Sequence, residues 1–161
     1  METLSFDLVQ FLYHLALAIL VGGSLILGTA VAPAVFASSR SRAEAGTLFG
    51  SVLARFDGLA IFSVIVVVVT SVLKAFAYEV TGAPEPRLVA RWIALALLAL
   101  VTLYASGYAN PVARAIRAQS PGFDDEAQSS PARAEFARLH QRSRRAMSVA
   151  VICGLVALFL G

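Results

Sequence analysis

Charged residues are scarce in this sequence. Only 14% of its 161 residues are Asp, Glu, Lys or Arg, against about 25% in an average soluble domain. Hydrophobic residues make up 58% of the chain. A soluble domain of this size would have to expose much of that apolar surface to water, which is unfavourable. The scarcity of charge therefore excludes an ordinary soluble domain and predicts an integral membrane protein.

Several chemical signatures are also missing. The one cysteine, Cys153, lies inside an apolar run, so no disulfide can form within the chain. The CxxC, HExxH and glycine-rich phosphate-loop patterns of metal, protease and nucleotide sites are absent. The arginines flank apolar runs and do not alternate with stacking aromatic residues. We therefore predict no catalytic site, no cofactor and no nucleic acid partner.

What the sequence does contain is four long apolar runs, each predicted to form a transmembrane helix. A helix that rises about 1.5 Å per residue needs about 20 residues to cross a hydrocarbon core of about 30 Å. In the second run, residues 64–69 are all β-branched and would favour a strand in water. A lone strand in lipid leaves its backbone polar groups unpaired, so a helix is expected. The predicted transmembrane helices are residues 8–36, 57–78, 88–109 and 146–160.

Three segments between these helices have their own character. Residues 43–56 gather apolar side chains on one helical face, which indicates either an amphipathic helix along the inner interface or an inward extension of the second transmembrane helix. Residues 132–146 form a basic amphipathic helix that is expected to continue into the fourth transmembrane helix. Residues 119–131 are rich in proline, glycine, serine and acidic residues, which is typical of a mobile loop.

The expected fold is a single all-α membrane domain over residues 1–161, a bundle of four transmembrane helices. Similar proline-containing ends of the first and third helices suggest two parallel helical hairpins. Lipid gives little hydrophobic drive for helix association, so small residues should allow close packing. A glycine-lined gap for a solute is the alternative use of the same residues. The residues expected to pack the helices are Ala18, Gly22, Gly23, Gly28 and Pro33.

The distribution of positive charge predicts the orientation. Ten arginines lie in or beside the two connections that follow the first and third helices, whereas the other side carries only Lys74, Arg87 and Arg91. Positive residues mark the cytoplasmic side of membrane proteins. We expect a protein of the inner (plasma) membrane with both termini outside and two basic cytoplasmic loops. Anionic lipids are expected at the basic face.

Few polar residues lie within or near the bilayer. His14 and His140 are expected at opposite sides of the membrane, so one monomer cannot use both for a single metal or haem. Haem held by His14 alone, or by His14 from two subunits, stays as an alternative to a helix-bonded histidine. Asp57 either caps the second helix or forms an ion pair at the inner face with Arg142 or Arg145.

Short segments along the chain resemble a known family. They are His14 to Ala18, Gly22-Gly23, Ala32 to Phe36, Ser41 to Gly46, Arg55 to Asp57, and Phe136 to Ser143. In this order they are similar to the family of the domain of unknown function 4149, the transmembrane protein 205-like proteins. The resemblance implies a fold distantly similar to copper-resistance D-like membrane proteins. It implies no settled biochemistry, although animal members have been associated with resistance to platinum drugs.

Three function classes follow from these observations. The first is the handling of a small solute or metal ion, with Asp57 near the inner mouth of a path beside the first helix. The second is a non-catalytic accessory subunit of a larger membrane complex. The third is a haem-binding redox protein that uses His14. A homodimer is also expected, because four short helices leave much lipid-facing surface.

Overall fold

The computed structural model describes residues 2–79, 82–120, 122–125, 127 and 130–161, and these residues form helices joined by short connections, with no strand among them. Four helical segments are long and apolar enough to cross a membrane. The all-α fold predicted from the sequence is therefore confirmed. The four candidate spans are Leu4–Ser38, Arg42–Glu79, Pro86–Gln119 and Pro131–Leu160.

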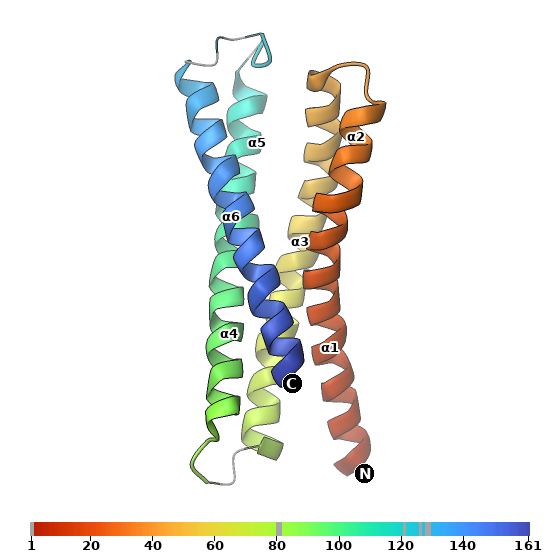
Figure 1. The fold of residues 1–161 in the computed structure, drawn as a ribbon, viewed down its shortest axis with the longest axis vertical. Helices are drawn as coiled ribbons and strands as arrows, with labels where there is room; N and C mark the ends of the chain where they lie inside the picture. Colours follow the sequence, from red (N-terminus) through yellow and green to blue (C-terminus); the bar gives the residue numbers. More distant parts are fainter. Residues whose placement is uncertain (1, 80–81, 121, 126, 128–129) are drawn as a thin grey trace.

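Each span is a long rod, and three of the four contain a short π-helical stretch, labelled η. The rods succeed one another as two antiparallel pairs, which we call the first and second hairpins (Figure 1). The first hairpin contains α1 (Glu2–Ile26), η1 (Leu27–Val31), α2 (Ala32–Ser38), α3 (Arg42–Lys74) and η2 (Ala75–Glu79). The second contains α4 (Pro86–Thr102), η3 (Leu103–Ala109), α5 (Asn110–Gln119) and α6 (Pro131–Leu160).

The two ends of the bundle differ in shape. At one end lie both termini and the connection around residues 82–85; we call it the terminal end (Figure 1). At the other end lie the connections that include residues 39–41 and 122–125; we call it the loop end. The hairpins pack together through α1, α3, α4 and α6 in the terminal half, whereas α2 packs on α3 and η1 and stands apart from α5 and α6. The bundle therefore opens towards the loop end.

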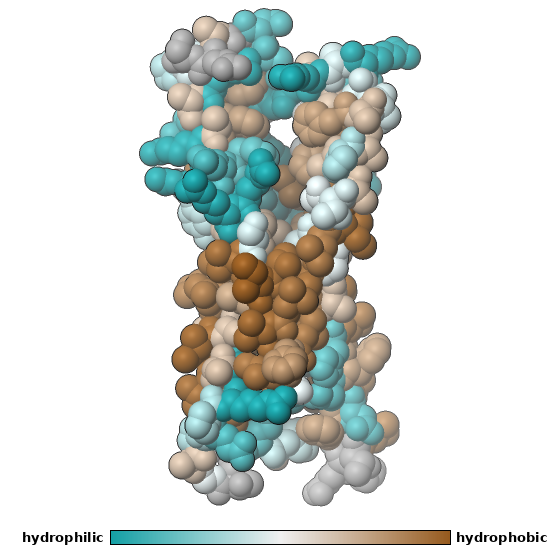
Figure 2. Space-filling view, viewed as in Figure 1, coloured by the Kyte–Doolittle hydropathy of each residue, from teal (hydrophilic) through white to brown (hydrophobic). Residues whose placement is uncertain are grey.

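An apolar core holds the terminal half together. Tyr13, Leu17, Val67, Leu98 and Ala157 are fully or almost fully buried where the four rods meet. Large apolar side chains also cover much of the outside of this half, where Figure 2 shows a broad brown band, while hydrophilic side chains gather towards the loop end. An apolar outer surface is what lipid contact requires.

Proline does not end the first and third rods. The sequence predicts that the third transmembrane helix stops at Asn110-Pro111, but α5 continues the rod to Gln119. The reason is the π-helical stretch directly before each proline. The N–H of Asn110 bonds to the carbonyl of Ala105, and that of Ala32 bonds to Leu27, five residues back in each case. This local shift of the hydrogen bonds accommodates a proline without breaking the helix.

Residues 43–56 and the following apolar run form one helix, α3, so the segment extends the span and is not a separate helix along the interface. Ser41 begins this helix: its hydroxyl accepts a hydrogen bond from the N–H of Glu44 (3.1 Å), whose carboxylate accepts one from the N–H of Arg40 (2.8 Å). Residues 132–146 likewise run without interruption into the apolar part of α6. Of the loop predicted at 119–131, positions 121, 126, 128 and 129 lie outside the described residues.

The small residues predicted to pack the helices are mostly not at helix contacts. Ala18, Gly28 and Pro33 are exposed, and a side-chain carbon at Gly22 would meet nothing within 4 Å. Only Gly23 of this set packs closely, against the ring of Phe56. The prediction fails because α1 buries a different face made of larger residues. The buried residues of α1 are Tyr13, Ala16, Leu17, Leu20 and Val21.

Candidate functional site

Asp57 stands at the centre of a buried polar network at the base of the opening. Its side chain is 4% exposed. One carboxylate oxygen accepts a hydrogen bond from the amide nitrogen of Asn110 (2.8 Å), and the other pairs with the guanidinium of Arg114 (2.5 Å). Ser143 donates its hydroxyl to the amide oxygen of Asn110 (2.5 Å). The network therefore ties α3 of the first hairpin to α5 and α6 of the second.

The ion pair differs from the one predicted. Arg142 and Arg145 are exposed on α6, and the partner of Asp57 is Arg114. The reason is the continuation of the third rod beyond Pro111, which places Arg114 one helical turn after Asn110 and on the same side. A buried carboxylate in a membrane protein needs such a partner. Because Arg114 is 31% exposed, the pair keeps contact with the opening.

A cleft lies between the two hairpins at the loop end. It comprises two adjoining cavities of about 530 and 460 Å³. Both are lined by the same five residues, which come from α3, α5 and α6: Phe49, Leu53, Asn110, His140 and Arg144. Figure 2 shows the hollow between the two halves near the loop end. Asn110 of the Asp57 network forms part of the wall of both cavities.

The charges around the cleft are mainly positive. In the described part of the chain, its larger cavity is lined by five arginines and one carboxylate, that of Asp124. Arg42 and Arg144 are exposed, and neither guanidinium has a hydrogen-bond or ion-pair partner among the described residues. The five arginines are Arg42, Arg114, Arg117, Arg133 and Arg144.

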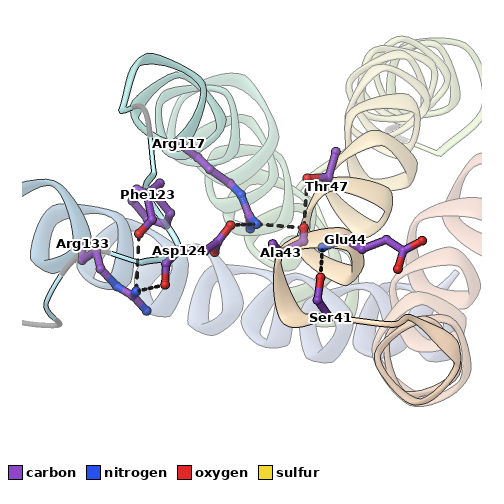
Figure 3. Close-up of polar contacts among 8 residues, drawn as sticks. All are labelled: Ser41, Ala43, Glu44, Thr47, Arg117, Phe123, Asp124 and Arg133. Carbon is purple, nitrogen blue, oxygen red and sulfur yellow. Dashed lines mark hydrogen bonds and ion pairs between the residues drawn. The ribbon is translucent and has the colours of Figure 1, made fainter.

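A cluster at the mouth of the cleft links the loop after α5 to the start of α3 (Figure 3). Arg117 donates to the carbonyl of Ala43 (3.0 Å) and pairs with Asp124 (2.7 Å). The Phe123 ring lies between two guanidinium groups, 5.7 Å from that of Arg117 and 5.6 Å from that of Arg133. A side chain at position 46 would collide with Arg117, so Gly46 permits this contact.

A second charged cluster is buried at the terminal end. Lys74 and Arg91 are 2% and 4% exposed, and both pair with the carboxylate of Glu79, which Lys74 reaches at 3.4 Å. The ring of Tyr13 lies against both cations, with the Lys74 ammonium 4.6 Å from its centroid. The Tyr13 hydroxyl donates to the carbonyl of Ala157 (3.4 Å). Two buried cations thus share one carboxylate and one aromatic face.

The two histidines lie in different parts of the bundle. His14, on α1 near the terminal end, places its Nδ1 2.9 Å from the carbonyl of Gln10 on its own helix. His140 lines the cleft and stacks on Phe136 with a centroid distance of 5.9 Å. Over the described ranges, no three side chains of His, Cys, Asp or Glu lie close enough to hold a metal ion together.

Sequence reasoning singled out Asp57 but missed the residues that surround it. Asn110, Arg114 and Ser143 were not associated with it because the third helix was taken to end before Arg114. Their spacing could have indicated the network. Asn110 and Arg114 are four residues apart, so they lie on one face if the third helix continues past Pro111. The terminal cluster was missed because Lys74 and Arg91 entered the sequence analysis only as charges that predict the orientation.

Comparison with known proteins gives one match. No curated protein and no solved structure matches the chain. The more distant resemblance to copper-resistance D-like proteins therefore stays a prediction. A family model described as domain of unknown function (DUF4149) matches residues 15–121, which include α3, the cleft arginines up to Arg117, and the terminal-end ions Lys74, Glu79 and Arg91. The chain therefore belongs to the DUF4149 family.

Proposed function

We propose that this membrane protein binds an anionic phospholipid in the cleft between its two hairpins. The observation that carries the proposal is that the side chains lining the cleft change from charged to apolar along its length. Arginines gather towards the loop end, and apolar side chains line the part nearer the bundle centre. An anionic phospholipid has a matching arrangement, with a charged phosphate headgroup at one end and apolar acyl chains at the other. This specifies the solute-handling function predicted from the sequence.

The headgroup is expected between Arg42 and Arg144. These residues come from α3 and α6, which belong to opposite hairpins, and both line the larger cavity. Their guanidinium groups have no partner among the described side chains, so they keep all their N–H donors available. A planar guanidinium can bind two phosphate oxygens at once, which favours a phosphate over a simple halide.

The acyl chains are expected in the second cavity. Apart from Asn110 and a few hydroxyls, its walls nearer the bundle centre are apolar and come from α1, η1 and α6. Gly28 adds no side chain, which leaves room on the η1 side. Cavities of about 300–1,000 Å³ are usual for small-molecule sites, and both parts of the cleft fall in this range. The apolar wall includes Leu25, Leu27, Met147, Val151 and Ile152.

The site fits the expected orientation of the protein. The loop end carries the arginine-rich connections, and by the positive-inside rule this supports a cytoplasmic loop end with the termini outside. The cleft would then face the cytoplasmic leaflet of the plasma membrane, which is rich in anionic lipid. The accessory-subunit, haem-binding and homodimer predictions stay predictions, because no described contact bears on them.

Two neighbouring arginines test the proposal. Arg144 lines both cavities, whereas Arg145 is exposed on the same helix and lines neither. The delipidated protein in detergent would be titrated with phosphatidylglycerol and with phosphatidylcholine, and bound lipid counted by native mass spectrometry. We expect Arg144→Gln to weaken phosphatidylglycerol binding about tenfold, which corresponds to the loss of one charged hydrogen bond.

The matched variant Arg145→Gln should weaken phosphatidylglycerol binding less than about twofold, as an exposed charge does. Phosphatidylcholine should bind weakly to all three proteins. Equal losses for the two variants would mean that surface charge alone attracts the lipid, and the cleft would then have no special role. Full competition by glycerol phosphate would identify a free phosphate as the ligand and would reject the lipid.

A further inference from the structure

Three hydroxyl groups in the centre of the bundle have no hydrogen-bond partner. Ser63 of α3, Thr102 of α4 and Ser106 of η3 are each 1% exposed, and none bonds to any described protein group. Other hydroxyls on these rods do have partners; that of Thr70, for example, bonds to its own helix at Val66 (2.7 Å). A buried donor without a partner costs about 1–3 kcal/mol. Three such groups indicate that something polar lies beside them.

The register of the helices places the three hydroxyls at one level. The spans containing α3 and η3 are antiparallel neighbours, and Asp57 lies beside Asn110. Ser63 lies six residues further along α3 than Asp57. Because the two spans are antiparallel, the position on the third rod that is level with Ser63 lies about six residues before Asn110. That position falls between Thr102 and Ser106. The three hydroxyls therefore lie near one level of the bundle, one to two turns deeper than Asp57.

Asn110 connects this level of the bundle to the cleft. It lines both cavities and bonds to Asp57. Ser106 and Thr102 lie four and eight residues before it, so the three side chains follow one face of the rod. Asn110, Ser106 and Thr102 thus form a polar line that runs from the cleft, past the Asp57 carboxylate, to the level of Ser63. An apolar layer of Leu17, Val67 and Leu98, all at most 1% exposed, follows on the terminal side.

We propose that the cleft continues past Asn110 as a water-filled polar channel that ends at this apolar layer. The ligands are water molecules bound by Ser63, Thr102, Ser106 and Asp57. Globular proteins hold about one buried water per 27 residues, each bonded to about three otherwise unsatisfied polar groups. The channel gives water access from the loop end to the middle of the bundle. It stops short of Lys74 and Arg91, and it does not depend on a lipid in the cleft.

Access can be measured with Ag⁺, a thiol reagent close to water in size. The protein in detergent would carry Cys153→Ala, so that the introduced cysteine is the only one. Ser106→Cys and Thr102→Cys are the test variants, and Val67→Cys, equally buried in the apolar layer, is the control. Modification would be followed by the loss of thiol reactivity after unfolding.

We expect Ser106→Cys and Thr102→Cys to react at least tenfold faster than Val67→Cys. Equal and slow reaction of all three would overturn the proposal. Melting temperatures give a second test that needs no cysteine. Ser63→Ala and Ser106→Ala should lower the melting temperature if the hydroxyls bind water, because bonds are lost.

The same substitutions should raise the melting temperature if the hydroxyls are truly unpaired, because an unsatisfied polar group is then removed. A rise in both variants would therefore overturn the proposal. Ser148→Ala is the control: Ser148 is exposed and bonds only to its own helix at Arg144 (3.1 Å), so its melting temperature should not change. Replacement by alanine is small enough for the variants to fold.

Discussion

The loop end and the terminal end of this bundle handle buried charge in different ways. At the loop end the hairpins separate, and Asp57 is paired with an arginine whose guanidinium still reaches the cleft. At the terminal end the helices close over Lys74 and Arg91, which share the carboxylate of Glu79. At the loop end the guanidinium can exchange its partner for water or a ligand, whereas at the terminal end the two buried cations stay paired with Glu79. Binding is therefore expected at the loop end and rigidity at the terminal end.

The largest effect is expected from Glu79→Gln. The substitution leaves the buried cations Lys74 and Arg91 without a carboxylate, and breaking a buried ion pair in this way costs about 3–5 kcal/mol. The free energy of unfolding in detergent would be measured for the full chain. Glu85→Gln is the control, since Glu85 is exposed at the same end and forms no ion pair in the described structure. Equal stability of the two variants would show that the terminal end is not fixed by this carboxylate.

A smaller loss, about 1–3 kcal/mol, is expected from Asp57→Asn. Arg114 would lose its partner, but its partial exposure allows it to bind water in the cleft. A double-mutant cycle with Arg114→Gln would measure the coupling, which should be about 0.5–3 kcal/mol. If the two losses simply add, the pair contributes nothing to joining the hairpins, and the contrast between the two ends disappears.

Gly154 provides a test of how closely the helices pack in the terminal half. A side-chain carbon there would collide with Val21 of α1 and crowd Leu98 of α4, so Gly154→Ala should cost about 1–3 kcal/mol. Gly22→Ala meets open space and should instead stabilise its helix by about 0.5–1 kcal/mol. Thermal unfolding of both variants in the same detergent checks the opposite signs. A loss at both positions would mean that α1 packs more closely than described.

The smallest loss of stability is expected from Gly46→Ala at the mouth of the cleft. The new methyl group would displace the flexible end of Arg117 from Ala43, at a cost of about 1 kcal/mol. Spin labels at Ser38 and Ala134, both exposed at the loop end, should report a broader distance distribution. Gly50→Ala serves as the matched substitution because nothing lies within 4 Å of it. An unchanged distribution in Gly46→Ala would show that Arg117 does not hold the hairpins together.

Much of the fold could be predicted from the sequence because lipid leaves few choices. The long apolar runs require helices, since backbone groups in hydrocarbon must be paired within the segment. The continuity of residues 132–146 with the fourth span also followed from the pattern. The third span was misjudged because Pro111 was read by the rules for ordinary α-helices, whereas η3 accommodates it.

The candidate site was predictable only in part. Asp57 was recognised because an acidic residue beside a transmembrane run needs a partner. Its partner could not be identified by charge alone, because the loop end carries ten arginines that sequence cannot rank. Close packing at Gly154 was also missed: whether a glycine meets a neighbour depends on which face of the helix is buried, and the apolar residues around it are found on all faces.

The stretch η3 determines the direction in which the side chains after it point relative to those before it. It thereby allows Arg91 to contact the terminal cluster while Asn110 and Arg114 contact Asp57. A π-turn holds about one residue more than an α-turn, and one residue corresponds to about 100° of rotation. An ordinary α-helix with the same number of residues over 103–109 would turn Asn110 and Arg114 away from Asp57, while Arg91 would stay beside Glu79. Among DUF4149 relatives, a one-residue gap in this short segment would therefore mark members whose third rod is an ordinary α-helix and which keep the partner of Asp57 without a π-turn.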